Sequence, residues 1–466
     1  MFQINKVKNN LVKLKQNRLN YVDLIFFQEL FPMRLIEMQV IGAMRPPDGA
    51  SKAMSQRFIR HFNTINIDLF EDHTITAIFS RIVLWHLDTK GFAKEFDPCI
   101  DQVVTATLEV HKFVVANLLP TPDHTHYLFS LKEFSRVICG CLLSVPETMD
   151  DLNAMKRLWV HEVMRVYYDR LITEEDQDVF VQKVRTICNA KLQITLKDLC
   201  SRILPKDKKE IDKGDMRKLL FCDFSDTKND EKHYKEITDI DKFRDISENL
   251  LVKYNEVSRK PMDLTLFDFA LEHLSRISRV LKQPESHMMV VGVGGSGRQS
   301  LSRLSAHIAG YDFYQFEMGK DDGLKEWRNN LKLVFRKTSQ TVNHNVLFLY
   351  ESQLADPRFM EDINNILYSG ELPNLFPFDE KQEIIENMRK LEKKLEKNQQ
   401  TDGTGTELFK LFVKRAKENL HIILAMSPLS DTFKSYIAKF PALMGCCTIN
   451  WMHQWPDDAL NFVAYR

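Results

Sequence analysis

Long apolar runs are absent from this sequence of 466 residues. No run approaches the roughly 18–20 residues of a membrane span, and the N-terminus is too charged for a signal peptide. Neither sign of charge is in excess, because 64 Lys and Arg balance 64 Asp and Glu. The sequence therefore favours neither a membrane surface nor nucleic acid as a partner, and it predicts a cytosolic protein.

Cysteine pairs with metal-site spacing are also missing. The eight Cys include no CxxC; Cys139 and Cys141 are two apart, and Cys446 and Cys447 are adjacent. Such spacing suits neither a zinc site nor a disulfide framework, so we expect buried free thiols and no metal site. Glycine and proline, at 16 each, are few for this length, which suggests a helix-rich chain.

A glycine-rich turn joins an apolar run to an amphipathic stretch in the second half of the chain. Residues 287–293 are the predicted strand, and the helix is predicted to begin near Arg298. Glycines let the backbone curl so that N–H groups point inward, and a helix N-terminus adds partial positive charge. This order predicts a phosphate-binding loop; a glycine-rich turn without a ligand is the alternative.

The turn nearly matches the phosphate-loop pattern GxxxxGK[ST]. Its candidate ligand-binding residues are Gly292, Val293, Gly294, Gly295, Ser296, Gly297, Arg298, Gln299 and Ser300. Arg298 stands where Lys is expected, and an Arg can pair with phosphate oxygens as a planar fork. Gln299 stands where Ser or Thr would hold Mg, and Ser300 comes one place late. The turn therefore predicts a phosphate site that departs from the usual pattern at the position that would hold Mg.

A phosphate loop that hydrolyses ATP needs carboxylates at the end of a neighbouring strand, for Mg and for water. The apolar run 345–350 predicts a strand buried on both faces of a parallel sheet. Tyr350 takes the place of the metal-binding Asp, and Glu351 that of the water-activating acid; a plain strand-ending polar residue is the alternative for Glu351. Ser427, near the end of the apolar run 421–428, could sense the γ-phosphate. Together they predict nucleotide binding without fast turnover.

The rest of the chain divides into a helical half and an alternating half. From 72 to 190, apolar residues recur at i, i+3, i+4 and i+7, as in amphipathic helices. After the loop, strands and helices alternate, which predicts an α/β fold with a doubly wound parallel sheet. The predicted divisions are an N-terminal segment at 1–71, a helical subdomain at 72–205, a connector at 206–235 and the α/β part at 236–466.

Arg57 and Arg136, which lie outside the loop, are further candidates. Arg57 and Arg60 lie three apart, so both can share one helix face and reach the phosphate of a neighbouring module. A solvated helix end is the favoured alternative from spacing alone. Arg136, in the helical half, is the other polar residue of interest.

Four segments resemble the fourth AAA+ module of an axonemal dynein heavy chain: GVGGSGRQSLSRL, FMEDINNILYSGELPNLF, NLHIILAMSPLSDTF and CCTINWMHQWPDDAL. Three earlier segments resemble the end of the third module: RFIRHFNTINIDLF, ANLLPTPDHTHYLFSLKEFSRVICG and MKRLWVHEVMRVYYDRLI. The resemblance covers about residues 34–466. It implies an AAA+ P-loop NTPase module preceded by an all-α AAA+ small subdomain, as a fragment or short isoform of the heavy chain.

The resemblance implies roles for individual residues. Arg57 matches the arginine finger of the third module, which would face the second module's nucleotide. Arg136 matches the sensor-two arginine of the third module's small subdomain. The stretch from Gly292 to Arg298 matches the phosphate loop of the fourth module, and Glu351 matches its acidic Walker B residue.

Two stretches depart from the family pattern. The sensor loop of the third module would read GPPGGGRN, but residues 45–52 read RPPDGASK and lack the Asn. The arginines expected before Phe440 are replaced, and the residues there are Lys434, Tyr436, Ala438 and Lys439. These replacements affect the finger that would complete the third module's site.

The resemblance implies ATP or ADP as the ligand, with Mg as a further candidate, in a ring ATPase that moves along microtubules. Three hypotheses stay open for this chain. The favoured one is a regulatory or structural part of the ring with weak or no hydrolysis. The others are a working ATPase and a module without a ligand, whose sheet and helices serve only packing. The implied partners are the remaining AAA+ modules and the intermediate, light intermediate and light chains of dynein. Microtubules would be reached only through the complete motor, and the implied location is the cytoplasm, cytoskeleton and ciliary axoneme.

Overall fold

The computed structural model describes residues 39–44, 54–202, 211–225, 232–316, 323–340, 343–354, 356–393 and 403–465. The chain forms two compact units, Met1–Leu69 and Phe70–Arg466. In the first unit, the described residues hold the short helix α2 (Gln56–Ile59). Residues 39–44 are exposed and form neither helix nor strand. The sensor-loop stretch 45–52 lies outside the described residues.

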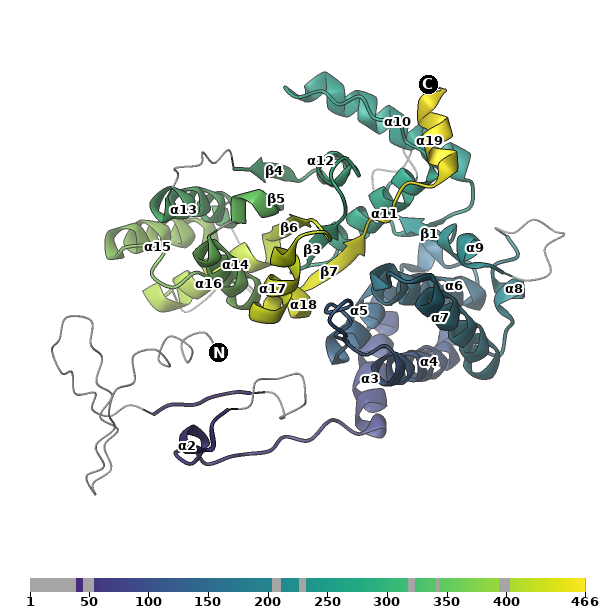
Figure 1. Ribbon diagram of the computed structural model, residues 1–466, viewed down its shortest axis with the longest axis horizontal. Coiled ribbons are helices and arrows are strands. Elements are labelled where there is room, and N and C mark those ends of the chain that lie inside the picture. The colour runs from purple at the N-terminus through teal and green to yellow at the C-terminus, as the bar shows by residue number, and fades with distance from the viewer. Residues whose placement is uncertain are drawn as a thin grey trace. The chain divides into compact units, whose positions relative to one another are not determined.

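The second unit begins with a bundle of helices, in agreement with the amphipathic pattern from residue 72 onward (Figure 1). Its helices are α3 (Asp72–Lys90), α4 (Asp97–Asn117), α5 (Leu131–Cys141), α6 (Leu152–Val166) and α7 (Glu174–Ile187), with the short turns η1 (Lys94–Phe96), η2 (Pro146–Thr148) and η3 (Tyr168–Arg170). Ser130 and Glu133 form a capping box at the start of α5, in which the Glu133 carboxylate accepts the Ser130 N–H at 2.7 Å. Trp159, Phe134 and Tyr167 are fully buried in the core of this bundle.

The predicted connector contains structure that the sequence patterns missed. Strand β1 (Leu220–Cys222) pairs antiparallel with β2 (Lys235–Ile237). Three residues are too few to show a period of two, and the charged residues around them favour a loop. The short helices nearby are η4 (Cys188–Leu192), α8 (Leu196–Leu199) and α9 (Lys213–Arg217), and two longer helices follow, α10 (Ile240–Val257) and α11 (Asp268–Lys282).

Five parallel strands form the sheet of the second unit, in the order β4-β5-β6-β3-β7. They are β3 (His287–Val291), β4 (Asp312–Gln315), β5 (Asn345–Tyr350), β6 (Leu420–Met426) and β7 (Cys447–Trp451). β3 and β6 are buried along their whole length, which explains their continuous apolar sequences. The predicted α/β fold with a parallel sheet is confirmed.

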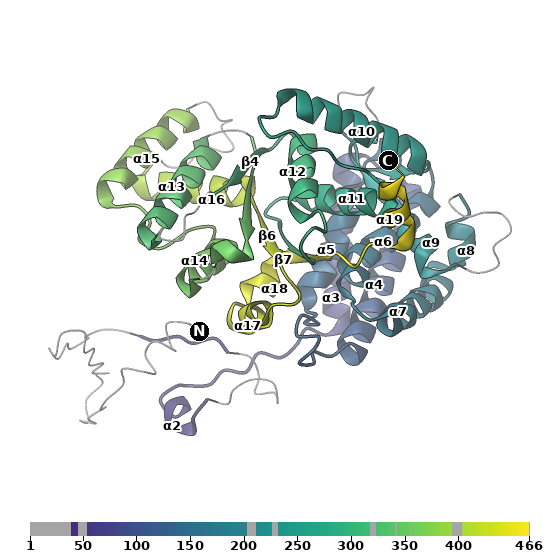
Figure 2. The same ribbon diagram turned by 45° about the horizontal axis from the view of Figure 1, so that its top comes forward.

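Helices cover the sheet from two sides. The helices after β3 are α12 (Arg298–Ala309), α13 (Leu324–Gln340), α14 (Pro357–Ser369), α15 (Phe378–Glu392), α16 (Gly405–Asn419), α17 (Asp431–Lys439), α18 (Ala442–Cys446) and α19 (Asp457–Ala464), with the turn η5 (Glu351–Leu354). Figure 2 shows the sheet between the group α13 to α16 and the group α10 to α12. Among the described residues, every helix is too short or too polar to cross a membrane.

All eight cysteines are free thiols. Six of them are buried as expected, but Cys139 is exposed and Cys446 is half-buried. Cys139 lies on α5, whose buried residues include Val137, Ile138 and Cys141, so it points to the solvent side of an amphipathic helix.

Candidate functional site

The glycine-rich turn lies between β3 and α12, where the sequence predicts it (Figure 1). Gly295 and Gly297 have φ angles of +83° and +87°, in the left-handed region that glycine adopts without steric cost. At Gly292, a Cβ would lie 2.8 Å from the Ser296 Oγ and 2.9 Å from the Met452 Cβ, so this position also requires glycine. The backbone therefore has the curled geometry that a phosphate loop needs.

Arg298 is the first residue of α12 and ties the turn to the neighbouring strand. Its Nη1 donates to the carbonyl oxygen of Met426 at 2.6 Å, and the Gly292 N–H donates to the same oxygen at 3.1 Å. Burial lowers the pKa of Arg298, whereas the Glu351 carboxylate and Tyr350 raise it. A guanidinium has five N–H donors, so this contact leaves others for a phosphate.

Gln299 and Arg303 share one face of α12, because they are four residues apart. The Gln299 amide donates to the Oε1 of Gln315 on β4 at 2.7 Å, and the Arg303 Nη2 donates to the same oxygen at 2.8 Å. Ser300, the next residue of the helix, is half-buried. Arg303 and Gln315 were missed in the sequence, since nothing in their spacing links the two residues.

Tyr350 and Glu351 stand at the carboxyl end of β5, next to the loop. Burial raises the pKa of Tyr350 while Arg303 and Arg298 lower it; the net shift is upward, so the phenol is neutral at pH 7. The Oε2 of Glu351 accepts the Ser427 N–H at 2.8 Å, and its Oε1 accepts the Thr432 hydroxyl.

The pKa of Glu351 is lowered by these contacts. Burial acts in the opposite direction, but hydrogen bonds from Ser430, Thr432 and Ser427, together with the charge of Arg298, outweigh it. Glu351 is therefore ionised at neutral pH, with both oxygens already accepting hydrogen bonds. Glu351 and Ser427, both predicted site residues, are in contact here, whereas no sequence pattern indicated Thr432, whose contact bridges 81 residues.

The metal side of the loop does not fit Mg²⁺. This ion prefers carboxylate, water and phosphate oxygens in an octahedral arrangement, and a phosphate loop usually holds it with a Ser or Thr and an Asp. Here the corresponding positions present the amide of Gln299 and the neutral phenol of Tyr350, beside the guanidinium of Arg303. In the described parts of the chain, no group of three His, Cys, Asp or Glu could hold a metal ion.

Of the two other predicted arginines, Arg136 lies away from this loop. The Arg136 Nη2 donates to the carbonyl of Gly445 at 3.0 Å, and its Nη1 donates to Glu133 at 3.3 Å. Gly445 precedes the amino end of β7, whereas the loop follows the carboxyl end of the parallel strand β3. Arg136 thus lies at the amino ends of the parallel strands, and the loop lies at their carboxyl ends. Arg57 is exposed on α2, in the other compact unit.

Tyr436 is one of the residues that replace the expected finger arginines. Its hydroxyl donates to the carbonyl of Leu354 at 2.6 Å, and its side chain is buried. Tyr436 therefore packs in the interior of the α/β part.

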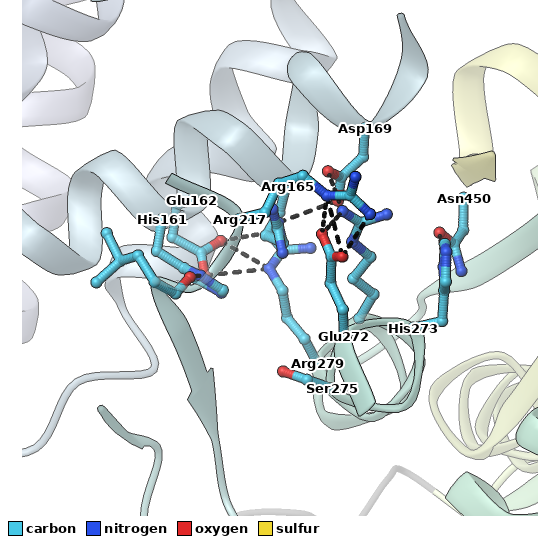
Figure 3. A network of polar contacts seen from close by, with 12 residues as sticks. His161, Glu162, Arg165, Asp169, Arg217, Glu272, His273, Ser275, Arg279 and Asn450 are labelled. Carbon is cyan, nitrogen blue, oxygen red and sulfur yellow. Dashed lines mark hydrogen bonds and ion pairs between the residues drawn. The ribbon is translucent and has the colours of Figure 1, made fainter. Parts of the chain in front are cut away.

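A second polar cluster, which the sequence did not reveal, joins the helical bundle to the α/β part (Figure 3). We call it the interface network; its members are Glu162, Arg165, Asp169, Arg217, Glu272, Arg276 and Arg279. All except Arg217 are buried. On helices with amphipathic patterns such residues look like a solvated face, which is why they were missed.

Salt bridges across the network link α6 and η3 to α11. The Glu162 carboxylate accepts the Arg279 Nε at 2.9 Å, and a second bond comes from the Arg279 Nη2. The Asp169 carboxylate lies 3.0 Å from both Arg165 and Arg276. A Cβ on Gly140 would lie 1.6 Å from the Glu162 Oε2, so only glycine lets this carboxylate pass α5.

Matches to known protein families cover most of the chain. Residues 262–466 match the family "P-loop containing dynein motor region D4", and residues 103–203 match the AAA+ lid domain. Residues 23–70 match a family described as a P-loop containing dynein motor region. The glycine-rich turn lies within the first match, and α5, α6, α7 and most of α4 lie within the second.

Curated relatives match along almost the whole chain. Dynein axonemal heavy chain 3 of Homo sapiens is 39% identical over 432 residues, which are 93% of this chain and 10% of the relative. Human dynein axonemal heavy chains 2 and 1 are 36% and 34% identical over 92% of this chain. The chain spans about a tenth of the length of these relatives. With its parallel sheet, glycine-rich turn and helical lid, the chain belongs to the axonemal dynein heavy chain family and has the AAA+ fold of the dynein motor region.

Proposed function

We propose that this chain is a regulatory or structural part of a dynein motor ring that binds ATP or ADP at its glycine-rich turn, with weak or no hydrolysis. The observation that carries the proposal is the curled backbone at Gly295 and Gly297 directly before Arg298 at a helix N-terminus. Backbone N–H groups, the helix dipole and a guanidinium there offer a site for phosphate oxygens.

Weak hydrolysis follows from the state of the candidate base. The hydrogen bonds from Ser427 and Thr432 stabilise the ionised form of Glu351 and lower its pKa, which makes it a weaker base for the attacking water. The metal side also lacks the residues that usually hold Mg²⁺ for phosphoryl transfer.

The relatives supply the wider setting of this proposal. We infer that residues 72–205 act as the small subdomain of a third AAA+ module and residues 236–466 as the large part of a fourth. In that setting Arg57 would reach the nucleotide of the second module, and Arg136 would act at the third module's site. The partners would be the other AAA+ modules and the intermediate, light intermediate and light chains, in the ciliary axoneme. Microtubules would be reached only through the complete motor.

A purely structural role is the second candidate, and one observation favours it. Arg298 donates to Met426 and each oxygen of Glu351 accepts a hydrogen bond, so both charged groups have protein partners without a ligand.

Calorimetry on the full chain separates the two candidates. We expect ADP and ATP to bind the parent, and Arg298→Ala to weaken binding at least tenfold, about the effect of one charge-assisted hydrogen bond. Lys253→Ala, at an exposed position of α10, is the control that should bind as the parent does. A folded parent that binds neither nucleotide would leave the structural role.

A further inference from the structure

We propose that nucleotide at this loop is bound without Mg²⁺, and that Arg303 supplies on the metal side the positive charge that the ion supplies in other phosphate loops. This inference rests on the proposed nucleotide binding and goes beyond it, because it states the form of the ligand.

Arg303 is held next to the position of the usual metal ligand. Its Nη2 and the Gln299 amide nitrogen converge on one oxygen of Gln315, at 2.8 Å and 2.7 Å. The distance between the Arg303 Nη2 and the Gln299 amide nitrogen therefore cannot exceed the sum of these two hydrogen-bond lengths. The guanidinium carbon of Arg303 also lies 5.3 Å from the centre of the Phe313 ring, which fixes its position from a second side.

Two guanidinium groups lie on this side of the loop among the described residues. Arg298 and Arg303 both lie close enough to Tyr350 to act on its phenol. A divalent cation placed among these groups would be repelled by the guanidinium charges. The phosphates of a nucleotide would instead be attracted, and both guanidinium groups keep N–H donors for them.

Among the described residues, the two acidic side chains that follow β5 already have partners. Each oxygen of Glu351 already accepts a hydrogen bond, from the Ser427 N–H and from the Thr432 hydroxyl, and these bonds hold the carboxylate in place. Asp356, a few residues later, caps α14 and pairs with Arg358 at 2.6 Å. A phenol and an amide do not replace these carboxylates as ligands of a hard cation.

The test compares ADP binding by the full chain in EDTA and in excess Mg²⁺, by calorimetry. We expect dissociation constants that agree within about threefold in the two buffers. We also expect Mn²⁺ to bind no more tightly to the ADP complex than to free ADP, measured by electron paramagnetic resonance. Binding of ADP only in the presence of Mg²⁺ would overturn the inference and leave the proposed function intact. No binding in either buffer by a folded chain would overturn both.

A variant of Arg303 tests whether this side chain contributes to ADP binding. Arg303→Gln should weaken ADP binding in EDTA about tenfold, whereas Lys253→Gln removes the same charge at an exposed site and should have no effect. If Arg303→Gln binds as the parent does, Arg303 has no such role.

A gain of metal dependence is the complementary test. Gln299→Thr with Tyr350→Asp restores the residues that usually hold Mg²⁺, and Mg²⁺ should then tighten ADP binding at least about tenfold. The single variant Gln299→Thr serves as a milder version if the pair does not fold. A restored pair that folds and still ignores Mg²⁺ would show that these two positions do not set the metal preference.

Discussion

The interface network and the phosphate loop are both built from arginines and carboxylates, yet they differ in burial and in partners. In the network, Arg279 and Glu162 are buried and bound to each other by side-chain contacts. At the loop, Arg298 and Glu351 are half-buried and are not bound to each other: Arg298 donates to the backbone of β6, and Glu351 accepts from the Ser427 N–H and the Thr432 hydroxyl. A buried charge without its partner is very unfavourable, whereas a half-buried one can turn to water or to a ligand. The comparison indicates that the network holds the fold and that the loop is free to exchange partners.

Arg279→Met should give the largest loss of stability. It leaves the Glu162 carboxylate buried without its guanidinium, which costs about 3–5 kcal/mol of unfolding free energy. Urea unfolding followed by circular dichroism measures it. Lys112→Met is the control, because it breaks an exposed ion pair with Asp72 and should cost less than about 1 kcal/mol. Equal losses in the two variants would erase the distinction between network and surface.

The network should also make stability depend on acid. Burial alone would raise the pKa of Glu272, but Arg276 and Arg217 outweigh it and lower the pKa to about 2. A lowered carboxyl pKa stabilises the fold above the unfolded pKa and loses that contribution as the pH falls through the folded value. We therefore expect a loss of about 3 kcal/mol between about pH 5 and 2.

Glu272→Gln should remove this part of the pH dependence. Its unfolding free energy should be lower than that of the parent at pH 7, and the two should converge as the pH approaches 2. Urea midpoints at several pH values provide the measurement. Parallel curves for the two proteins would mean that another carboxyl group is responsible.

The smallest effect is expected at the loop, from Thr432→Val. The variant removes the hydroxyl that donates to Glu351, so the pKa of Glu351 should move back up toward its ordinary value. Because Glu351 is only half-buried and solvent screens it, the unfolding free energy should change by less than about 1 kcal/mol. Carbon NMR titration of the Glu carboxyls tests the pKa, with the exposed Thr186→Val as control. An unchanged Glu351 titration would contradict the hydrogen bond.

The strands were predictable because burial on both faces gives continuous apolar runs. The run 345–350 coincides with β5, and the run 421–428 differs from β6 only at its ends. The place of the turn between β3 and α12 was also predictable, because glycine spacing is a local signal. β1 and β2 were not, since each has three residues and gains its stability from its partner.

The side-chain partners within the site could not be predicted from the sequence. The contact of Thr432 with Glu351 and that of Arg303 with Gln315 depend on how separate elements meet. The same holds for Arg279 and Glu162, which are 117 residues apart and look like solvated charges on their own helices. Local periodicity predicts which face of a helix is polar, but not which other element that face will meet.

The bond between Glu162 and Arg279 also bears on where the chain can be cut. Residues 70–466 behave as one compact unit, although a charge-rich connector runs between the bundle and the sheet. A fragment that starts after this connector would expose the partners of the network to water. Protein engineers should therefore cut near residue 70, and differential scanning calorimetry of residues 70–466 should record a single cooperative transition.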